Sequence, residues 1–225
     1  MQVVRQRTTH LIMRSKEIEE FKKNLTLTQT QRSLLVGMLL GDGHLETQDH
    51  GRTYRLKVEH STIQKEYVEW LYEQFKSFVR TPPQEKKKLL HGKSHTSYSF
   101  STYSLGAFRF YAQQFYAGRK KVMPKLIEKL INPLALAIWF MDDGSCKSER
   151  HSTYIIHALG YNKNNLELVK KVFQEKFGIA IGIHKQYDRW RIYVYSDSAM
   201  KFRKLIEPYV IPSLKYKLGN TVPKE

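Results

Sequence analysis

The sequence has a single cysteine, no long apolar run and few acidic residues. Cys146 alone cannot form an internal disulfide, which excludes a disulfide-rich scaffold and fits a reducing compartment. The longest apolar stretch, residues 134–141, is far shorter than the roughly 20 residues that cross a bilayer. Residues 1–14 hold no sustained apolar segment of the kind found in a secretory signal. We therefore expect an intracellular protein without a membrane partner.

The shortage of acids makes the chain strongly basic. Its 38 Lys and Arg face 21 Asp and Glu, which gives a formal charge of +17. Between Lys76 and Lys125 there are eleven Lys or Arg and one acid, Glu85. A basic domain with a 41% hydrophobic content folds around a core and usually binds a polyanion, most often nucleic acid. The basic stretch supplies four expected DNA contacts: Lys86, Lys88, Lys93 and Lys120.

Two apolar runs each end in an acidic-glycine turn. One covers residues 35–43 and ends in Gly41-Asp42-Gly43, and the other covers residues 136–144 and ends in Asp142-Asp143-Gly144. Each predicts a buried helix that carries an Asp at its carbonyl end, where the helix dipole disfavours a carboxylate by roughly 0.3–1 kcal/mol. Two carboxylates brought together repel each other unless a cation lies between them. Oxygen ligands with open positions suit Mg²⁺, so the pair Asp42 and Asp143 predicts a metal site.

The order of expected elements repeats along the chain. In each half an α-β-β-α-β-β-α outline is visible, with one strand per half weakly signalled. Gly37 and Gly41 share one face of the first helix, which allows another backbone to approach closely. Pro82-Pro83 and residues 85–88 predict a loop. In the first half we expect helices at residues 29–40, 65–78 and 105–116 and strands at residues 54–60 and 97–102. In the second half we expect strands at residues 153–159 and 190–195 and helices at residues 164–177 and 198–206.

Alternation along two of these strands separates an apolar face from a polar one. Trp190, Ile192 and Val194 share one face and should pack on helices. The opposite face presents Arg189, Arg191 and Tyr193, and Arg55, Lys57 and Glu59 make a similar face in the first half. Basic and hydrogen-bonding side chains on a sheet suit phosphates and base edges, so these six residues are expected DNA contacts.

With these residues in view, the two runs resemble the LAGLIDADG motif. From about residue 34 to residue 222 the chain is similar to single-chain, two-motif LAGLIDADG homing endonucleases, above all the intron-encoded mitochondrial omega-type members, through Trp139–Gly144 and Ile206–Asn220. The resemblance implies an α+β fold of two pseudo-symmetric αββαββα repeats whose antiparallel sheets form a DNA-binding saddle. It divides the chain into a basic N-terminal arm at 1–24, a first repeat at 25–131 and a second repeat at 132–225.

The resemblance also implies the roles of individual residues. Asp42 and Asp143 match the acids that bind metal and act in catalysis, and the carbonyls of Gly41 and Asp142 just before them are further metal contacts. Lys121 and Lys217 match basic residues that stabilise phosphate charge or orient the attacking water. Ile138 and Asp142 depart from the family pattern, because small residues are typical at both positions.

The expected activity is that of a Mg²⁺-dependent, site-specific endodeoxyribonuclease, with Mn²⁺ as a substitute metal. It would act as a monomer on a long asymmetric duplex and leave 3′ overhangs, as the family does. Two alternatives stay open: an RNA-binding maturase whose partner is the host intron RNA, and a catalytically silent DNA-binding protein. Members of the family occur in organelles (mitochondrion or chloroplast) and in prokaryotic cytoplasm, and the sequence does not choose between them.

Overall fold

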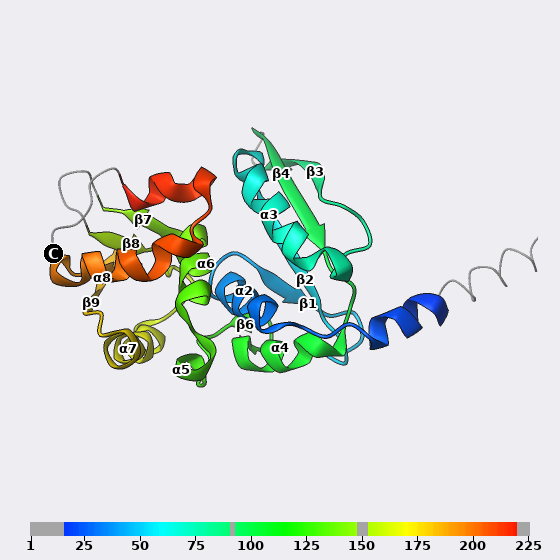
Figure 1. Cartoon of the computed structure of the whole chain (residues 1–225), viewed down its shortest axis with the longest axis horizontal. Helices are drawn as coiled ribbons and strands as arrows, with labels where there is room; N and C mark the ends of the chain where they lie inside the picture. The colour runs from blue at the N-terminus through cyan, green and yellow to red at the C-terminus, as the bar shows by residue number, and fades with distance from the viewer. Residues whose placement is uncertain (1–15, 91–92, 148–152, 220–225) are drawn as a thin grey trace, which may run out of the picture.

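The computed structural model describes residues 16–90, 93–147 and 153–219. Two four-stranded antiparallel sheets dominate this part of the chain, with the strand orders β1-β2-β4-β3 and β7-β8-β10-β9 (Figure 1). The first sheet consists of β1 (His44–Glu46), β2 (Arg55–Ser61), β3 (Gln84–Leu90) and β4 (Lys93–Ser101). The second consists of β7 (Gly144–Cys146), β8 (Tyr154–Ile156), β9 (Ile181–Gln186) and β10 (Arg189–Val194).

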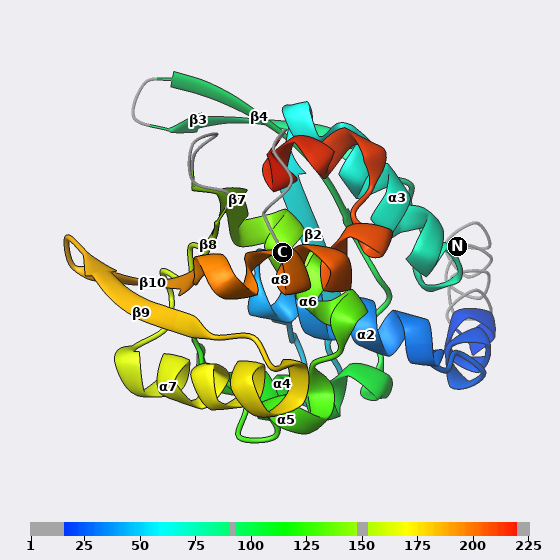
Figure 2. The ribbon, with the colours of Figure 1, turned by 60° about the vertical axis from the view of Figure 1, so that its left-hand side comes forward.

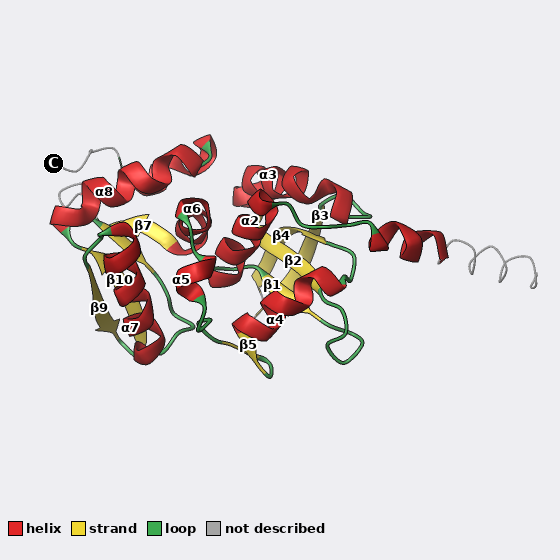
Figure 3. Ribbon diagram, turned by 60° about the horizontal axis from the view of Figure 1, so that its bottom comes forward, coloured by secondary structure: helices red, strands yellow, loops and turns green. Residues whose placement is uncertain are grey.

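Helices cover one face of each sheet (Figure 3). The α-helices are α2 (Gln29–Leu40), α3 (Lys65–Phe75), α4 (Arg109–Phe115), α5 (Ile127–Leu130), α6 (Pro133–Asp143), α7 (Lys163–Val172) and α8 (Ser196–Ile206). A small ribbon of β5 (Tyr116–Ala117) and β6 (Lys120–Lys121) follows α4, and the 3₁₀ segments η1 (Thr62–Gln64) and η6 (Pro212–Leu218) follow β2 and the α8 region. The repeated topology confirms the predicted α+β fold of two αββαββα units. The limits 1–24, 25–131 and 132–225 stay predictions, and residues 1–15 of the predicted arm lie outside the described residues.

The apolar faces of the strands pack on these helices as the alternation predicts. Leu56 and Val58 of β2 and Ile192 and Val194 of β10 are buried, and Trp190 is partly buried against the same core. One continuous hydrophobic core joins both halves, because the motif helices α2 and α6 are buried along most of their length and contact each other. Among the described residues, no helix is long and apolar enough to cross a membrane.

One expectation about the outline is wrong. Residues 85–88 form part of strand β3 instead of a loop, and they pair with β4 so that Lys86 lies opposite Ser97 and Lys88 opposite His95. Lysine has a low intrinsic preference for strands, but the long ladder of antiparallel pairs to β4 supplies the hydrogen bonds that hold the segment extended. The hairpins β3–β4 and β9–β10 both project beyond the helices toward the left of Figure 2.

The two motif helices begin with caps and cross at small residues. The Thr28 side chain forms a capping box with Gln31 at the start of α2, and Asn132 caps α6 through the Ala135 N–H. A methyl group added at Gly37 would lie 2.5 Å from the Ala135 carbonyl oxygen and 2.5 Å from Ile138 Cβ. The predicted close approach at Gly37 is therefore confirmed, and Ile138 fills the space that the glycine leaves.

Candidate active site

The carbonyl ends of α2 and α6 lie side by side, and each carries one motif aspartate. Asp42 follows the α2 cap residue Gly41, and Asp143 is the last residue of α6. A Cβ at Gly41 would lie 2.5 Å from Asp142 Cβ, so the helices are in contact at this level as well. Crossing at two glycines thus brings Asp42, Asp142 and Asp143 into one cluster at the junction between the two halves.

Asp142 is a half-buried member of this cluster and joins the two halves. Its Oδ2 accepts a hydrogen bond from the backbone N–H of Asp42 at 3.0 Å, and its Oδ1 accepts one from the Tyr67 hydroxyl at 2.8 Å. Burial, together with the negative charge of Asp42, raises the pKa of Asp142 to about 7. Both carboxylate oxygens are engaged by protein donors, so the Asp142 side chain fixes the backbone that carries Asp42.

The side chains of Asp42 and Asp143 have different surroundings. The Asp42 side chain is 53% exposed, and its Oδ2 lies 3.7 Å from Nδ1 of the buried His60. Asp143 Oδ2 accepts a hydrogen bond from the Trp139 indole N–H at 3.1 Å. Burial and the charges of Asp142 and Asp42 raise the pKa of Asp143 to about 7. A bound cation would stabilise the ionised form of acids whose pKa is raised in this way.

Each half also brings one lysine to the cluster. Lys121 Nζ, at the end of β6, donates to the Gly41 carbonyl at 2.5 Å. Lys217 Nζ, on η6, donates to the carbonyls of Met141 at 2.5 Å and Asp142 at 3.0 Å. Burial lowers the pKa of both lysines, while the neighbouring aspartates act in the opposite direction. Both cations neutralise a helix carbonyl end, where a positive charge is favourable.

The donor set fits a hard divalent cation. The available atoms are oxygens: the carboxylates of Asp42 and Asp143 and the carbonyls of Gly41 and Asp142. Among the described residues there is no group of three or more His, Cys, Asp or Glu side chains arranged to hold a metal. Mg²⁺ usually binds through one or two carboxylates and completes its coordination shell with water and substrate phosphates. Two carboxylates that leave coordination positions open match this preference.

The polar face of the first sheet carries a network of ion pairs. Arg55 donates to Glu46 Oε2 at 2.7 Å, and Lys57 lies 3.2 Å from Glu59 Oε2. Lys88 donates to Glu59 Oε1 at 2.6 Å, and this bond is the main reason why the pKa of Glu59 falls to about 2. Three of the predicted cations are therefore paired with carboxylates, so this face has less free positive charge than its basic residues alone indicate.

The polar face of the second sheet is less neutralised. Arg191 Nε is buried and has no hydrogen-bond partner in the described part of the chain, and Arg189 lies 3.8 Å from the exposed Asp188. Tyr193 packs its ring against His184 with 4.8 Å between centroids. Arg189, Arg191 and Tyr193 thus share the face that the alternation assigns to them.

The remaining predicted DNA contacts lie at two other places. Lys86 is exposed on β3, on the same face as Lys88, and Lys120 is exposed on the β5–β6 ribbon next to Lys121. Lys93 belongs to β4, but its side chain lies outside the described part of the structure. Lys120 is therefore next in sequence to the lysine that reaches the aspartate cluster.

Sequence reasoning missed three residues of the cluster: His60, Tyr67 and Trp139. Tyr67 and Trp139 occupy ordinary buried helix positions, and nothing in their spacing distinguishes them from core residues. His60 lies on the apolar face of strand β2, which it shares with Leu56 and Val58. A titratable residue on an apolar strand face was the one signal that could have pointed to the site.

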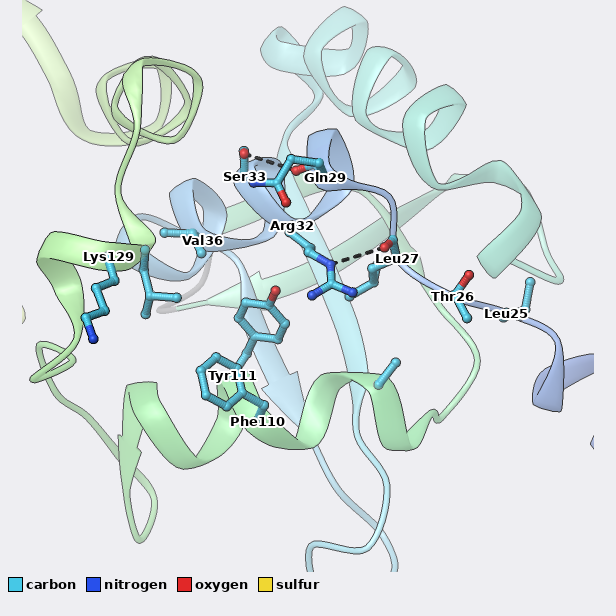
Figure 4. A pocket seen from close by; sticks show the side chains of 12 residues that line it. Leu25, Thr26, Leu27, Gln29, Arg32, Ser33, Val36, Phe110, Tyr111 and Lys129 are labelled. Carbon is cyan, nitrogen blue, oxygen red and sulfur yellow. Dashed lines mark hydrogen bonds between the residues drawn. The ribbon is translucent and has the colours of Figure 1, made fainter.

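A separate pocket of about 400 Å³ lies at the start of α2 (Figure 4). It is lined by Arg32, whose Nε donates to the Leu27 carbonyl at 3.2 Å, and by the aromatic pair Phe110 and Tyr111. Because α2 spans 12 residues, a rise of roughly 1.5 Å per residue separates this pocket from Asp42 by about a helix length. The pocket is thus not part of the aspartate cluster.

Comparisons with known proteins agree on one family. The model of the LAGLIDADG DNA endonuclease family matches residues 32–202. The probable intron-encoded endonuclease 1 of Wickerhamomyces canadensis is 29% identical over 211 residues, which cover 91% of this chain and 90% of that protein. The cytochrome b mRNA maturase bI2 of Debaryomyces hansenii is 29% identical over 203 residues, which cover 88% of this chain and 76% of that protein.

The solved structure of the homing endonuclease I-WcaI bound to its DNA recognition sequence has the same fold. It superposes with a TM-score of 0.85 at 27% sequence identity and covers 91% of this chain and 93% of that chain. The similarity therefore extends over both sheets and both motif helices.

Proposed function

The chain belongs to the LAGLIDADG DNA endonuclease family, and from this premise we propose that it is a site-specific homing endonuclease that hydrolyses one phosphodiester bond in each strand of a DNA duplex. The observation that carries the proposal is the meeting of Asp42 and Asp143 at the crossing of α2 and α6, with one lysine from each half beside them. Two acids and two cations at a pseudo-symmetric junction match a substrate with two scissile phosphates.

Asp42 and Asp143 would hold Mg²⁺, with Mn²⁺ as a substitute, and the carbonyls of Gly41 and Asp142 would add further contacts. A carbonyl oxygen has two lone pairs, so the hydrogen bonds from Lys121 and Lys217 leave room for a second partner. When bound, the metal would supply Lewis acidity that activates water and stabilises the leaving oxygen.

The two lysines would act on the negative charge that develops at the phosphates. Lys121 Nζ and Lys217 Nζ are held at the carbonyl ends of the motif helices, next to the aspartates. A positive charge fixed before the reaction stabilises a developing anion without reorganisation, and it does so more strongly when partly buried. We therefore assign Lys121 and Lys217 to phosphate stabilisation or to orientation of the attacking water.

The polar faces of the two sheets would bind the duplex on either side of the cut. I-WcaI is described as bound to its DNA recognition sequence, and its fold covers most of this chain. The two faces differ in sequence and in charge pairing, so a single chain can recognise an asymmetric target without forming a dimer. Cleavage across the minor groove would leave short 3′ overhangs. A mitochondrion, a chloroplast or a prokaryotic cytoplasm is the proposed location.

The test is selection of a target from randomised duplexes. The purified protein is incubated with the library and Mg²⁺, and the new ends are sequenced. We expect one family of sites with 3′ overhangs, no ends in EDTA, and no double-strand ends from Asp42→Asn or Asp143→Asn. Asp197→Asn, an exposed acid in the first turn of α8, is the matched control and should cut like the unaltered protein. Unspecific ends, or none with any divalent metal, would reject the proposal.

A maturase activity is the second candidate, because the Debaryomyces hansenii relative is named a cytochrome b mRNA maturase. In that case the chain would bind host intron RNA and assist its splicing. The Asp42→Asn variant separates the two activities, since help with splicing does not need a metal at the aspartates. Splicing of the host intron that survives in this variant, with cleavage lost, would show that both activities are present.

A further inference from the structure

The strand registers of the two sheets define which residues are equivalent in the two halves. Asp42 and Asp143 hold the same place in their motifs, and His44 and Ser145 follow each by two residues. His44 lies opposite Lys57, and Ser145 lies opposite Ile155, so Lys57 corresponds to Ile155. Three residues further along, His60 corresponds to Ala158. The pairing continues as far as His157, whose N–H donates to the Asp143 carbonyl at 2.9 Å, and Ala158 is the next residue, where the chain turns away from the strand.

The two aspartates consequently have different side-chain neighbours. His60 Nδ1 lies 3.7 Å from Asp42 Oδ2, whereas the methyl group of Ala158 offers Asp143 nothing. In the other direction, the Trp139 indole donates to Asp143 Oδ2 at 3.1 Å. The residue four positions before Asp42 is Met38, whose side chain has no N–H to donate. Each carboxylate therefore has one side-chain neighbour that the other lacks.

The His60 ring is fixed while the Asp42 side chain is free to adjust. The His60 side chain is 3% exposed, and its ring packs on Tyr67 with 5.1 Å between centroids. The Asp42 side chain is 53% exposed, so a small rotation of its carboxylate closes the 3.7 Å gap to hydrogen-bonding distance. A rigid imidazole beside a mobile carboxylate restrains the carboxylate and loses little entropy itself.

We propose that His60 is a positioning residue for Asp42 alone, so that cleavage of the two DNA strands depends on different side chains. This inference rests on the proposed nuclease function. In repeat one the exposed carboxylate is restrained by a buried imidazole, and in repeat two the carboxylate is restrained by the indole of its own helix. One strand can then be slowed selectively by a change at His60, and the other by a change at Trp139.

The first test follows the two strands separately. The duplex selected as above carries a different label on each strand, and the strand tied to Asp42 is the one that Asp42→Asn slows more. We expect His60→Ala to slow that strand about tenfold, the effect of losing one hydrogen bond to a charged group, and the other strand less than about twofold. His60→Gln keeps an N–H donor and should restore most of the rate. Trp139→Phe should show the reverse strand preference.

The second test needs no metal and no cleavage. Thermal unfolding of the metal-free protein is measured for His60→Ala, Asp42→Ala and the double variant, because an asparagine at position 42 would still accept a hydrogen bond from His60. If the two side chains interact with the strength that the tenfold change in rate implies, the Tm of the double variant departs from additivity by about 3–5 °C in a chain of this size. This cycle also shows whether His60→Ala folds.

Three results would overturn the inference: equal slowing of both strands by His60→Ala, equal slowing of both by Asp42→Asn, or additive changes in Tm. Failure of the unaltered protein to cut any duplex would instead reject the nuclease function. The unfolding cycle would then still decide whether His60 and Asp42 are coupled.

Discussion

The Asp142→Asn substitution changes the most unusual group in the site, a buried carboxylate between two halves of the molecule. The pKa of Asp142 is raised to about 7 from 3.8 by burial first and by the charge of Asp42 second. A folded-state pKa above the unfolded value means that the protonated form contributes stability, which is fully present below about pH 4 and is lost as the pH rises through about 7. At pH 8 the metal-free protein therefore carries an ionised group that destabilises it.

The size of this effect follows from the pKa difference. Each unit corresponds to about 1.4 kcal/mol, so a rise of roughly three units sets a ceiling of about 4 kcal/mol on the free energy that the ionised Asp142 costs. An asparagine keeps the hydrogen bonds, because its oxygen accepts from the Asp42 N–H and its amide donates to the Tyr67 oxygen. We expect Asp142→Asn to stabilise the metal-free protein at pH 8 by an amount below this ceiling.

Urea unfolding in EDTA at pH 5 and pH 8 measures the effect. The gain should be largest at pH 8 and less than half as large at pH 5, where Asp142 is protonated in the folded protein but already ionised in the unfolded chain. The lowered pKa of His60 changes stability in the opposite direction as the pH falls, but comparing the two proteins at each pH cancels that contribution. The reasoning would be refuted if the Asp142→Asn variant had a lower free energy of unfolding than the unaltered protein by the same amount at both pH values. The hydrogen bonds to the ionised carboxylate would then contribute more than its burial costs.

Three further predictions concern the aspartates, a lysine and a glycine. Asp42→Asn and Asp143→Asn should each abolish double-strand cleavage and leave DNA binding within a few-fold in a gel-shift assay; a large loss of binding would make these acids contacts instead of metal ligands. Lys217→Met should lower the cleavage rate by about 10²-fold with little change in Kd, and equal losses in both would reduce Lys217 to a binding residue. Gly37→Ala should lower stability by about 1–3 kcal/mol in urea unfolding, because its methyl group meets Ile138 Cβ at 2.5 Å; an unchanged midpoint would contradict the close packing of the helices.

The features that the sequence predicted well are those set by local periodicity. The two motif helices, the strand β10 with its buried Ile192 and Val194, and the close approach at Gly37 all follow from spacing that one segment carries by itself. The repeated order of elements then gave the fold, because each half had the same signals in the same sequence.

The features that the sequence did not predict depend on contacts between distant segments. Tyr67 reaches Asp142 across 75 positions, and neither residue signals the other. The strand at residues 85–88 forms because β4 pairs with it, against the low strand preference of its lysines. The pairing of Arg55 with Glu46 and of Lys88 with Glu59 was not predicted for the same reason, since each ion pair joins residues of different strands.

The most direct measurement of the central claim is cleavage of the selected duplex by the unaltered protein and by the Asp42→Asn, Asp143→Asn double variant, with Mg²⁺ added stepwise and both product ends sequenced. Our account predicts metal-dependent cutting of both strands at fixed positions with 3′ overhangs, and a double variant that binds the duplex and leaves it intact. Cutting at the same positions by the double variant, or cutting that is independent of divalent metal, would contradict it.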